Sequence, residues 1–129
     1  MEIDWTKLAE RAIDVRERSY SPYSKFAVGA ALLDQTGKVF VGCNVENASY
    51  GLAICAERSA MVSAISSGCA NPVAIVIAAD PLAPPCGACR QFLVEFGNDQ
   101  FMVRSVSAAD PTQFQTWTAT ELLPDRFEF

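Results

Sequence analysis

The amino-acid sequence predicts one α/β domain with a layered core. Helical and strand-like hydrophobic patterns alternate through the middle of the chain, as is typical of layered α/β proteins. The length of 129 residues fits a single domain over residues 1–129, and no repeat or linker divides it. Half of the residues are hydrophobic and 19% are charged, a globular composition that argues against disorder.

The first third of the chain predicts a helix followed by a hairpin of strands. Apolar residues recur at helical spacing over residues 4–19, and Asp4 is a suitable N-cap. The apolar, glycine-containing run 26–33 suits a buried strand. A turn is expected at 34–37, and residues 38–44 are expected to form the second strand of the hairpin.

The rest of the chain continues the alternation of helices and strands. The expected elements are a helix over 54–67 that ends at Gly68, a strand over 73–79, a helix over 86–96 that ends at Gly97, a strand over 101–103 and a helical turn at 121–124. The intervening segment 105–120 is only weakly patterned, and no element is predicted there.

Charge and hydropathy exclude several classes of function. Fifteen acidic and ten basic residues give a net charge of −5, which disfavours binding to nucleic acid because that requires a basic face. The longest strictly apolar run, Val73–Ala79, is far shorter than the roughly 20 residues of a membrane span. The acidic N-terminus has no apolar signal core, so we expect a cytoplasmic protein that acts on a small molecule.

The chain has five cysteines and no histidine. An odd cysteine count without a signal peptide argues against a disulfide scaffold and favours metal ligation in a reducing compartment. The absence of histidine excludes Ser/His/Asp and Cys/His catalysis, so a metal site must use thiolates and carboxylates. The cysteines are Cys43, Cys55, Cys69, Cys86 and Cys89.

The sharpest motif is Pro85-Cys86-Gly87-Ala88-Cys89. A C-x-x-C pair at the start of a helix can place both sulfurs on one metal, and the free N–H groups of the helix end stabilise thiolates. The motif alone also fits a redox pair or half of a structural zinc site.

A second motif, Cys55-Ala56-Glu57, supplies a third thiolate at another predicted helix start. Three protein ligands with an open fourth position are typical of catalytic zinc, and Glu57 is placed to carry protons. Arg58 can offset the negative charge of three thiolates, although a lone arginine more often forms a surface ion pair. Taken singly, Cys55 could be a small buried apolar residue and Glu57 a helix-start carboxylate.

These two motifs in this order resemble the zinc-site signature of the cytidine deaminases. The segments 22–31 and 42–52 and the C-terminal Leu122-Leu123-Pro124 with Phe127 resemble the same family, so the likeness covers about residues 5–104 and 119–127. The short chain and the all-cysteine ligand set are similar to the small homotetrameric branch. The resemblance implies a three-layer α-β-α fold with a central mixed sheet of about five strands.

The resemblance also implies a reaction. The chain is expected to deaminate cytidine and deoxycytidine hydrolytically to uridine and deoxyuridine, with release of ammonia, in pyrimidine salvage. One Zn²⁺ per chain would be bound by Cys55, Cys86 and Cys89. Glu57 would move protons between water, N3 of the pyrimidine and the leaving amine.

Substrate contacts are implied position by position. The N–H of Ala56 would hold the base carbonyl and the carbonyl of Pro85 would receive the amino group, while Phe26 would pack against the substrate. Asn44 and Glu46 would bind the ribose hydroxyls, a role that their i, i+2 spacing at a strand end permits. The same two residue types also suit strand-end capping, and an aromatic such as Phe26 is by default a core residue.

The remaining implied contacts come from an assembly. Ala48 and Tyr50 would line a neighbouring subunit's pocket near the 5′-hydroxyl, and Phe127 would close over a site. We therefore expect a homotetramer with sites at subunit interfaces. Without the resemblance, Tyr50 would be an ordinary core or surface aromatic, and Phe127 a frayed or docked terminal residue.

Three alternatives remain at this stage. The loop Asp80–Pro85 is short and residues 105–118 do not follow the family's usual run, so the substrate could be a related cytosine nucleoside analogue or antibiotic. A non-catalytic zinc module would need a fourth ligand, for which neither Cys43 nor Cys69 has suitable spacing. A polynucleotide deaminase is opposed by the acidic charge.

Overall fold

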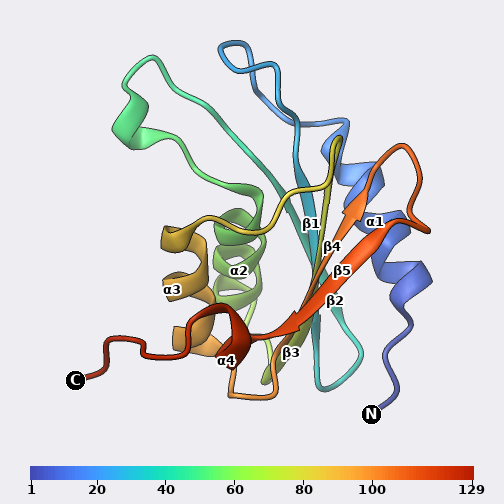
Figure 1. Ribbon diagram of the computed structural model, residues 1–129, viewed down its shortest axis with the longest axis vertical. Helices are drawn as coiled ribbons and strands as arrows, with labels where there is room; N and C mark the ends of the chain where they lie inside the picture. The colour runs from blue at the N-terminus through green and yellow to red at the C-terminus, as the bar shows by residue number, and fades with distance from the viewer.

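A five-stranded mixed sheet forms the middle layer of the protein, for which a computed structural model describes residues 1–129 (Figure 1). The strand order is β2-β1-β3-β4-β5, and only the pair β3 and β4 is parallel. The strands are β1 (Gly29–Asp34), β2 (Val39–Cys43), β3 (Pro72–Ala79), β4 (Met102–Ser107) and β5 (Phe114–Thr118). The α/β class with a central sheet of five strands is confirmed.

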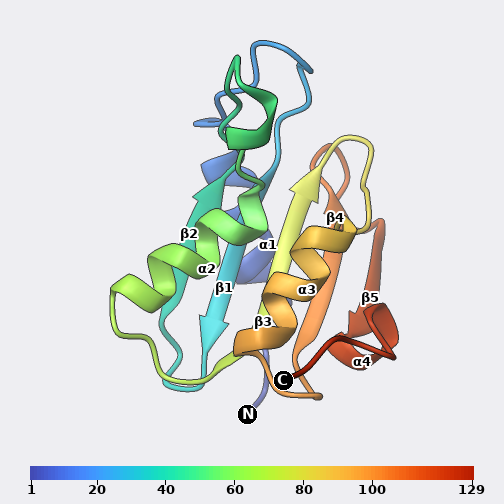
Figure 2. The ribbon, with the colours of Figure 1, turned by 90° about the vertical axis from the view of Figure 1, so that its left-hand side faces the viewer.

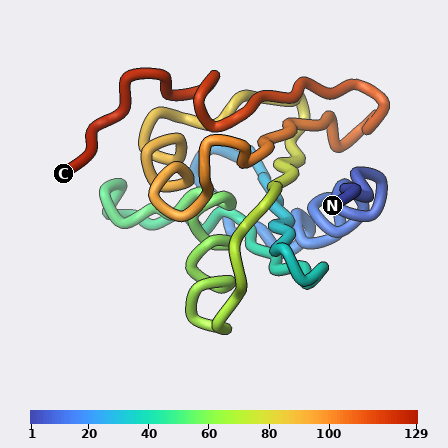
Figure 3. The backbone as a smooth tube through the Cα atoms, turned by 90° about the horizontal axis from the view of Figure 1, so that it is seen from below, coloured from blue at the N-terminus to red at the C-terminus, as the bar shows by residue number.

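Helices cover both faces of this sheet. One face carries α1 (Trp5–Arg16), and the other carries α2 (Ala56–Ser66) and α3 (Gly87–Phe96) (Figures 2 and 3). Strand β1 is buried along its whole length because its residues alternate between the two layers. Ala30 and Leu32 pack under α2 and α3, whereas Ala31 and Leu33 pack under α1.

Local signals explain where the helices begin and end. The Asp4 carboxylate accepts a hydrogen bond from the Lys7 N–H at 3.1 Å and caps α1, as predicted. Gly97 ends α3, also as predicted. The short helix α4 (Ala119–Leu122) begins with a capping box between Thr118 and Glu121. None of the helices combines the length and apolar character that crossing a membrane requires.

Helix α2 lies directly against β2 because residue 42 is glycine. A Cβ atom at Gly42 would lie 2.4 Å from the main-chain nitrogen of Ala60 in α2, closer than any side chain permits. The absence of a side chain at Gly42 therefore sets how closely α2 approaches the sheet.

The weakly patterned segment 105–120 contains an unpredicted strand. Strand β4 extends to Ser107 and β5 follows at Phe114–Thr118, so the expectation of a strand limited to 101–103 is wrong. Two buried serines hide the strand pattern, and each is hydrogen-bonded to a loop: the Ser105 hydroxyl donates to the Ala83 carbonyl at 2.8 Å, and the Ser107 hydroxyl accepts from the Asp110 N–H at 3.2 Å.

The first strand of the hairpin begins later than predicted. Residues 26–28 lie outside β1, which starts at Gly29. The Val28 N–H and the Phe26 carbonyl bond to the side chain of Asn44, and the Ala27 carbonyl accepts from Arg16 Nε at 2.9 Å. This irregular stretch forms one wall of the site described below.

Candidate active site

Two helix N-termini meet at one end of the sheet and bring three thiols together. Cys55 is the N-cap of α2, Cys86 is the N-cap of α3, and Cys89 lies in the first turn of α3. Their three Sγ atoms lie within 4.8 Å of one another. Neither capping cysteine uses its side chain to cap its own helix, so both sulfurs are free to face the cluster.

The geometry of this cluster fits a zinc ion. Tetrahedral zinc with Zn–S bonds of about 2.3 Å places its sulfurs roughly 3.8 Å apart, within the spread that the three thiols show. Thiolates are ligands that zinc prefers, and the positive ends of two helices favour their ionised form. The cluster offers three ligands from this chain, which leaves a fourth position for another group.

Arg58 stabilises the charge of this cluster. Its Nη2 lies 3.7 Å from Cys55 Sγ and 3.3 Å from the Ala53 carbonyl, while its Nε is buried without a partner. A hydrogen bond from Cys89 and the contact with Arg58 lower the pKa of Cys55 to about 5. Arg58 therefore favours the thiolate form of Cys55.

Glu57 lies in the first turn of α2 beside the cluster, with only 5% of its surface exposed. Burial raises the pKa of its carboxyl above the ordinary value for glutamate. A carboxyl that can hold a proton closer to neutral pH is suited to general acid and base work.

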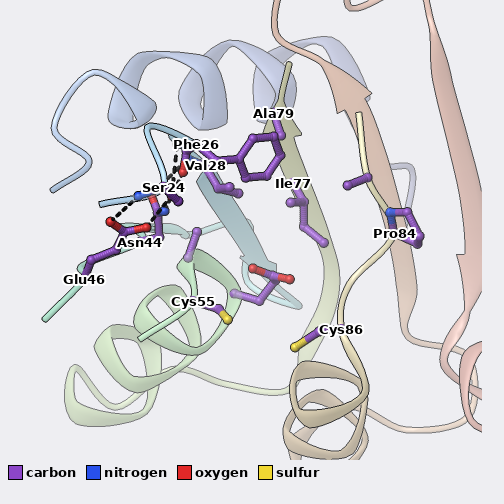
Figure 4. Close-up of a pocket in the computed structure, with 13 residues that line it drawn as sticks. Ser24, Phe26, Val28, Asn44, Glu46, Cys55, Ile77, Ala79, Pro84 and Cys86 are labelled. Carbon is purple, nitrogen blue, oxygen red and sulfur yellow. Dashed lines mark hydrogen bonds between the residues drawn. The ribbon is translucent and has the colours of Figure 1, made fainter. Parts of the chain in front are cut away.

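A pocket of about 250 Å³ opens in front of Glu57 and the thiols (Figure 4). Cys55, Glu57 and Cys86 line its inner end. Figure 4 shows Ser24, Asn44 and Glu46 along one side. The remaining lining residues are Phe26, Val28, Ala56, Ile77, Ala79, Ala83 and Pro84. Most of the lining is apolar, with polar groups at the two ends, which suits a flat base joined to a polar group.

Asn44 holds the irregular stretch 26–28 in place. Its Oδ1 accepts from the Val28 N–H at 2.9 Å and from the Ser19 hydroxyl, and its Nδ2 donates to the Phe26 carbonyl at 2.8 Å. One Nδ2 hydrogen has no partner in the chain. Asn44 therefore shapes the pocket wall and also has a free donor.

Glu46 is held by the preceding turn. Its Oε1 accepts from the N–H groups of Tyr23 at 2.9 Å and Ser24 at 3.1 Å, and its Oε2 accepts from the Ser24 hydroxyl. Chiefly because of the Ser24 hydroxyl, the pKa of Glu46 lies below its ordinary value. The carboxylate stays ionised and acts as an acceptor.

Four of the residues predicted to contact the substrate lie outside this pocket. Pro85 is buried next to it, and its carbonyl accepts from Arg90 Nε at 2.8 Å. Ala48 and Tyr50 lie between β2 and α2: Ala48 is exposed, and Tyr50, which is 81% exposed, begins the short 3₁₀-helix Tyr50–Leu52. Phe127 is 69% exposed and lies beside α3 in the C-terminal segment.

Several lining residues were not predicted. Ile77 and Ala79 continue the alternation of β3 that places Ile75 under α2 and α3, so the strand period could have located them. Ser24 lies in the segment 22–31 that resembles the family, but no pattern in that segment marks it as a pocket residue. Ala83 reaches the pocket because Ser105 fixes its loop, and that contact has no signature in the sequence.

Comparisons with known proteins identify the family of this chain. Residues 3–105 match the family described as the cytidine and deoxycytidylate deaminase zinc-binding region. The chain belongs to this family. The matched range includes all three thiols and Glu57.

Individual members of the family match nearly the whole chain. A cytidine deaminase of Halalkalibacterium halodurans is 46% identical over 97% of this chain and 95% of its own length. A probable cytidine deaminase of Dictyostelium discoideum is 48% identical over 92% of this chain and 82% of its own. The crystal structure of cytidine deaminase from Burkholderia pseudomallei is 44% identical, covers 97% of this chain and 100% of its own, and has a TM-score of 0.89.

Proposed function

We propose that this member of the family is a zinc-dependent aminohydrolase that converts cytidine and deoxycytidine to uridine and deoxyuridine with release of ammonia. The observation that carries the proposal is a buried glutamate, Glu57, that lines the same pocket as two members of a cluster of three thiols. The matched family and the 46% identity to a cytidine deaminase support the substrate class.

The inner end of the pocket performs the chemistry. Cys55, Cys86 and Cys89 would hold one zinc, which when bound activates water as a nucleophile. Glu57 would accept one proton of that water and pass it to N3 of the pyrimidine, and it would then take the second proton, from the hydroxyl added to the base, and deliver it to the departing amine. Its burial excludes competing solvent, and its raised pKa suits a group that must both take and give a proton.

The first turn of α2 and the loop before α3 would orient the base. The N–H of Ala56 has no partner within the helix and lies at the pocket, where it would donate to the base carbonyl. Pro85 precedes the capping Cys86, and its carbonyl would accept from the amino group of the substrate. Phe26 would pack against the substrate from the opposite wall.

Asn44 and Glu46 would bind the sugar. The free Nδ2 hydrogen of Asn44 can donate to a hydroxyl, and the ionised Glu46 can accept from one. A hydroxyl is both acceptor and donor, so this pair matches a sugar hydroxyl.

We propose further that the protein works in the cytoplasm as a homotetramer with sites shared between subunits. The exposed aromatic rings of Tyr50 and Phe127 support an assembly because they lie outside this chain's own pocket. Contact with a neighbour would bury them near that neighbour's pocket. Five cysteines without a disulfide, three of them in a metal-binding arrangement, fit a reducing compartment.

The decisive experiment is loss of ultraviolet absorbance when purified protein is added to cytidine and, separately, to deoxycytidine. Zinc content is measured in the same sample. Turnover with one zinc per chain is expected. Zinc without turnover of either nucleoside would contradict the proposed substrate and direct the assay to cytosine nucleoside analogues.

A further inference from the structure

Ser24 connects the two residues that flank the bound nucleoside in the proposed function. Its hydroxyl accepts from the Phe26 N–H at 3.0 Å and donates its only hydrogen to Glu46 Oε2. Figure 4 shows the three residues on the same side of the pocket. The Ser24 hydroxyl therefore joins the wall that faces the base to the group that faces the sugar.

The hydrogen bonds to Glu46 leave it little freedom. A carboxylate offers about four acceptor positions. Two on Oε1 are taken by the N–H groups of Tyr23 and Ser24, and one on Oε2 is taken by the Ser24 hydroxyl. One acceptor position remains, on Oε2, and the Ser24 hydroxyl determines where it points.

We propose that Ser24 is a positioning residue for sugar recognition, which fixes Glu46 Oε2 so that its remaining acceptor position meets a hydroxyl of the substrate. The proposal rests on the proposed function and adds a residue to it. Without the Ser24 hydroxyl, Oε2 has no partner in the chain, and the carboxylate plane is held through Oε1 alone.

If Ser24 had a purely structural role, its loss would lower the stability of the turn and weaken the binding of all ligands equally. Ser24 is exposed in the chain, and the turn that contains it keeps two main-chain bonds to Glu46 and the Lys25 N–H bond to the Ser21 carbonyl at 3.0 Å. Loss of one exposed hydroxyl should change overall stability little. Its effect should instead be larger with ligands that carry the hydroxyl that Glu46 binds, because water can replace the Ser24 hydroxyl as the acceptor for the exposed Phe26 N–H.

The test compares cytidine with 2′,3′-dideoxycytidine, which lacks both ring hydroxyls. For Ser24→Ala we expect kcat/KM for cytidine to fall about tenfold, mostly through KM, the size of one lost charge-assisted hydrogen bond. The inhibition constant of dideoxycytidine against cytidine is expected to change less than twofold. Ser24→Thr keeps the hydroxyl and should restore most of the cytidine activity.

Two further variants test how Ser24 acts. Ser66→Ala removes an exposed hydroxyl that bonds the Ser63 carbonyl at the far end of α2, and it should behave like wild type with both ligands. In a Glu46→Gln background, Ser24→Ala should add little further loss, because Ser24 acts through that carboxylate.

The positioning role would be overturned if Ser24→Ala weakened dideoxycytidine binding by the same factor as it lowered kcat/KM for cytidine. An unchanged kcat/KM for cytidine would overturn it too. Additive losses in the Glu46→Gln background would overturn it as well. Failure of the wild-type protein to deaminate cytidine would instead overturn the proposed function, so the two failures are distinguishable.

Discussion

The two ends of the pocket are built in different ways. The inner end comes from the first turns of α2 and α3, where Cys89 is fully buried and Glu57 is 5% exposed. The outer end comes from the loop 19–28 and from residues 44–46, whose side chains are fixed by hydrogen bonds to loop main chain. Helix geometry places the thiols and Glu57, and hydrogen bonds to loop main chain place Asn44 and Glu46, to which we assign sugar recognition.

This comparison predicts that changes at the inner end abolish activity and changes at the outer end weaken binding. The largest effect is expected for Cys86→Ala. Loss of one of three thiol ligands should remove zinc and with it all measurable turnover. Zinc content by elemental analysis and turnover of cytidine are the measurements.

Cys69→Ala is the matched control for that change, because Cys69 lies outside the thiol cluster, between α2 and β3. It should keep both zinc and activity. Stoichiometric zinc in folded Cys86→Ala would show that Cys86 is not a ligand.

The next largest effect is expected for Glu57→Ala. Zinc and fold should be retained, while kcat falls by about 10³ or more because no other group can move the protons. Glu95→Ala, which changes an exposed carboxylate on α3, should leave kcat unchanged. Near-normal turnover by a zinc-loaded Glu57→Ala protein would remove Glu57 from the reaction.

A smaller effect is expected for Asn44→Ala. It should raise KM for cytidine by about tenfold to a hundredfold, because it removes a sugar contact and loosens residues 26–28. The loss of activity on free cytosine should be smaller. Asn71→Ala, an exposed change near the other end of the sheet, is the control. If activity on cytidine and on free cytosine fell equally, Asn44 would only hold the pocket wall and would not bind the sugar.

The smallest effect concerns pH. The pKa of Glu46 is lowered chiefly by the Ser24 hydroxyl, so Glu46 stays ionised above its ordinary value of 4.5 and becomes protonated only below it. KM for cytidine should therefore be constant as pH falls toward that value and rise only beneath it. A rise in KM centred near neutral pH would contradict this, since it would require a raised pKa at Glu46.

The inner end was far easier to predict from sequence than the outer end. Cys55, Cys86 and Cys89 follow from spacing at helix starts, and Asp4 and Gly97 are local helix signals with local causes. By contrast, the dual role of Asn44 depends on a loop that is 16 to 18 residues away in sequence. No local pattern encodes contacts of that kind.

The missed strand has a similar explanation. Arg104 lies between the rings of Trp5 and Phe114, at 4.1 and 4.0 Å from their centroids, so a charged residue occupies a sheet position through contacts with distant aromatics. Ser105 and Ser107 are buried because loop groups satisfy them. Strand prediction depends on alternation of apolar and polar residues. Contacts with residues distant in sequence let polar side chains occupy buried strand positions, so that alternation is lost.

The close approach of α2 to Gly42 has a consequence for the metal. Cys55 and Glu57 move with α2, while Cys86 and Cys89 move with α3, so the size of the thiol cluster depends on how α2 is seated. A methyl group at position 42 would push α2 away from β2 and so move the Sγ of Cys55 away from those of Cys86 and Cys89. A screen for variants that lose zinc should therefore recover Gly42 together with the cysteines, although this residue never faces the pocket.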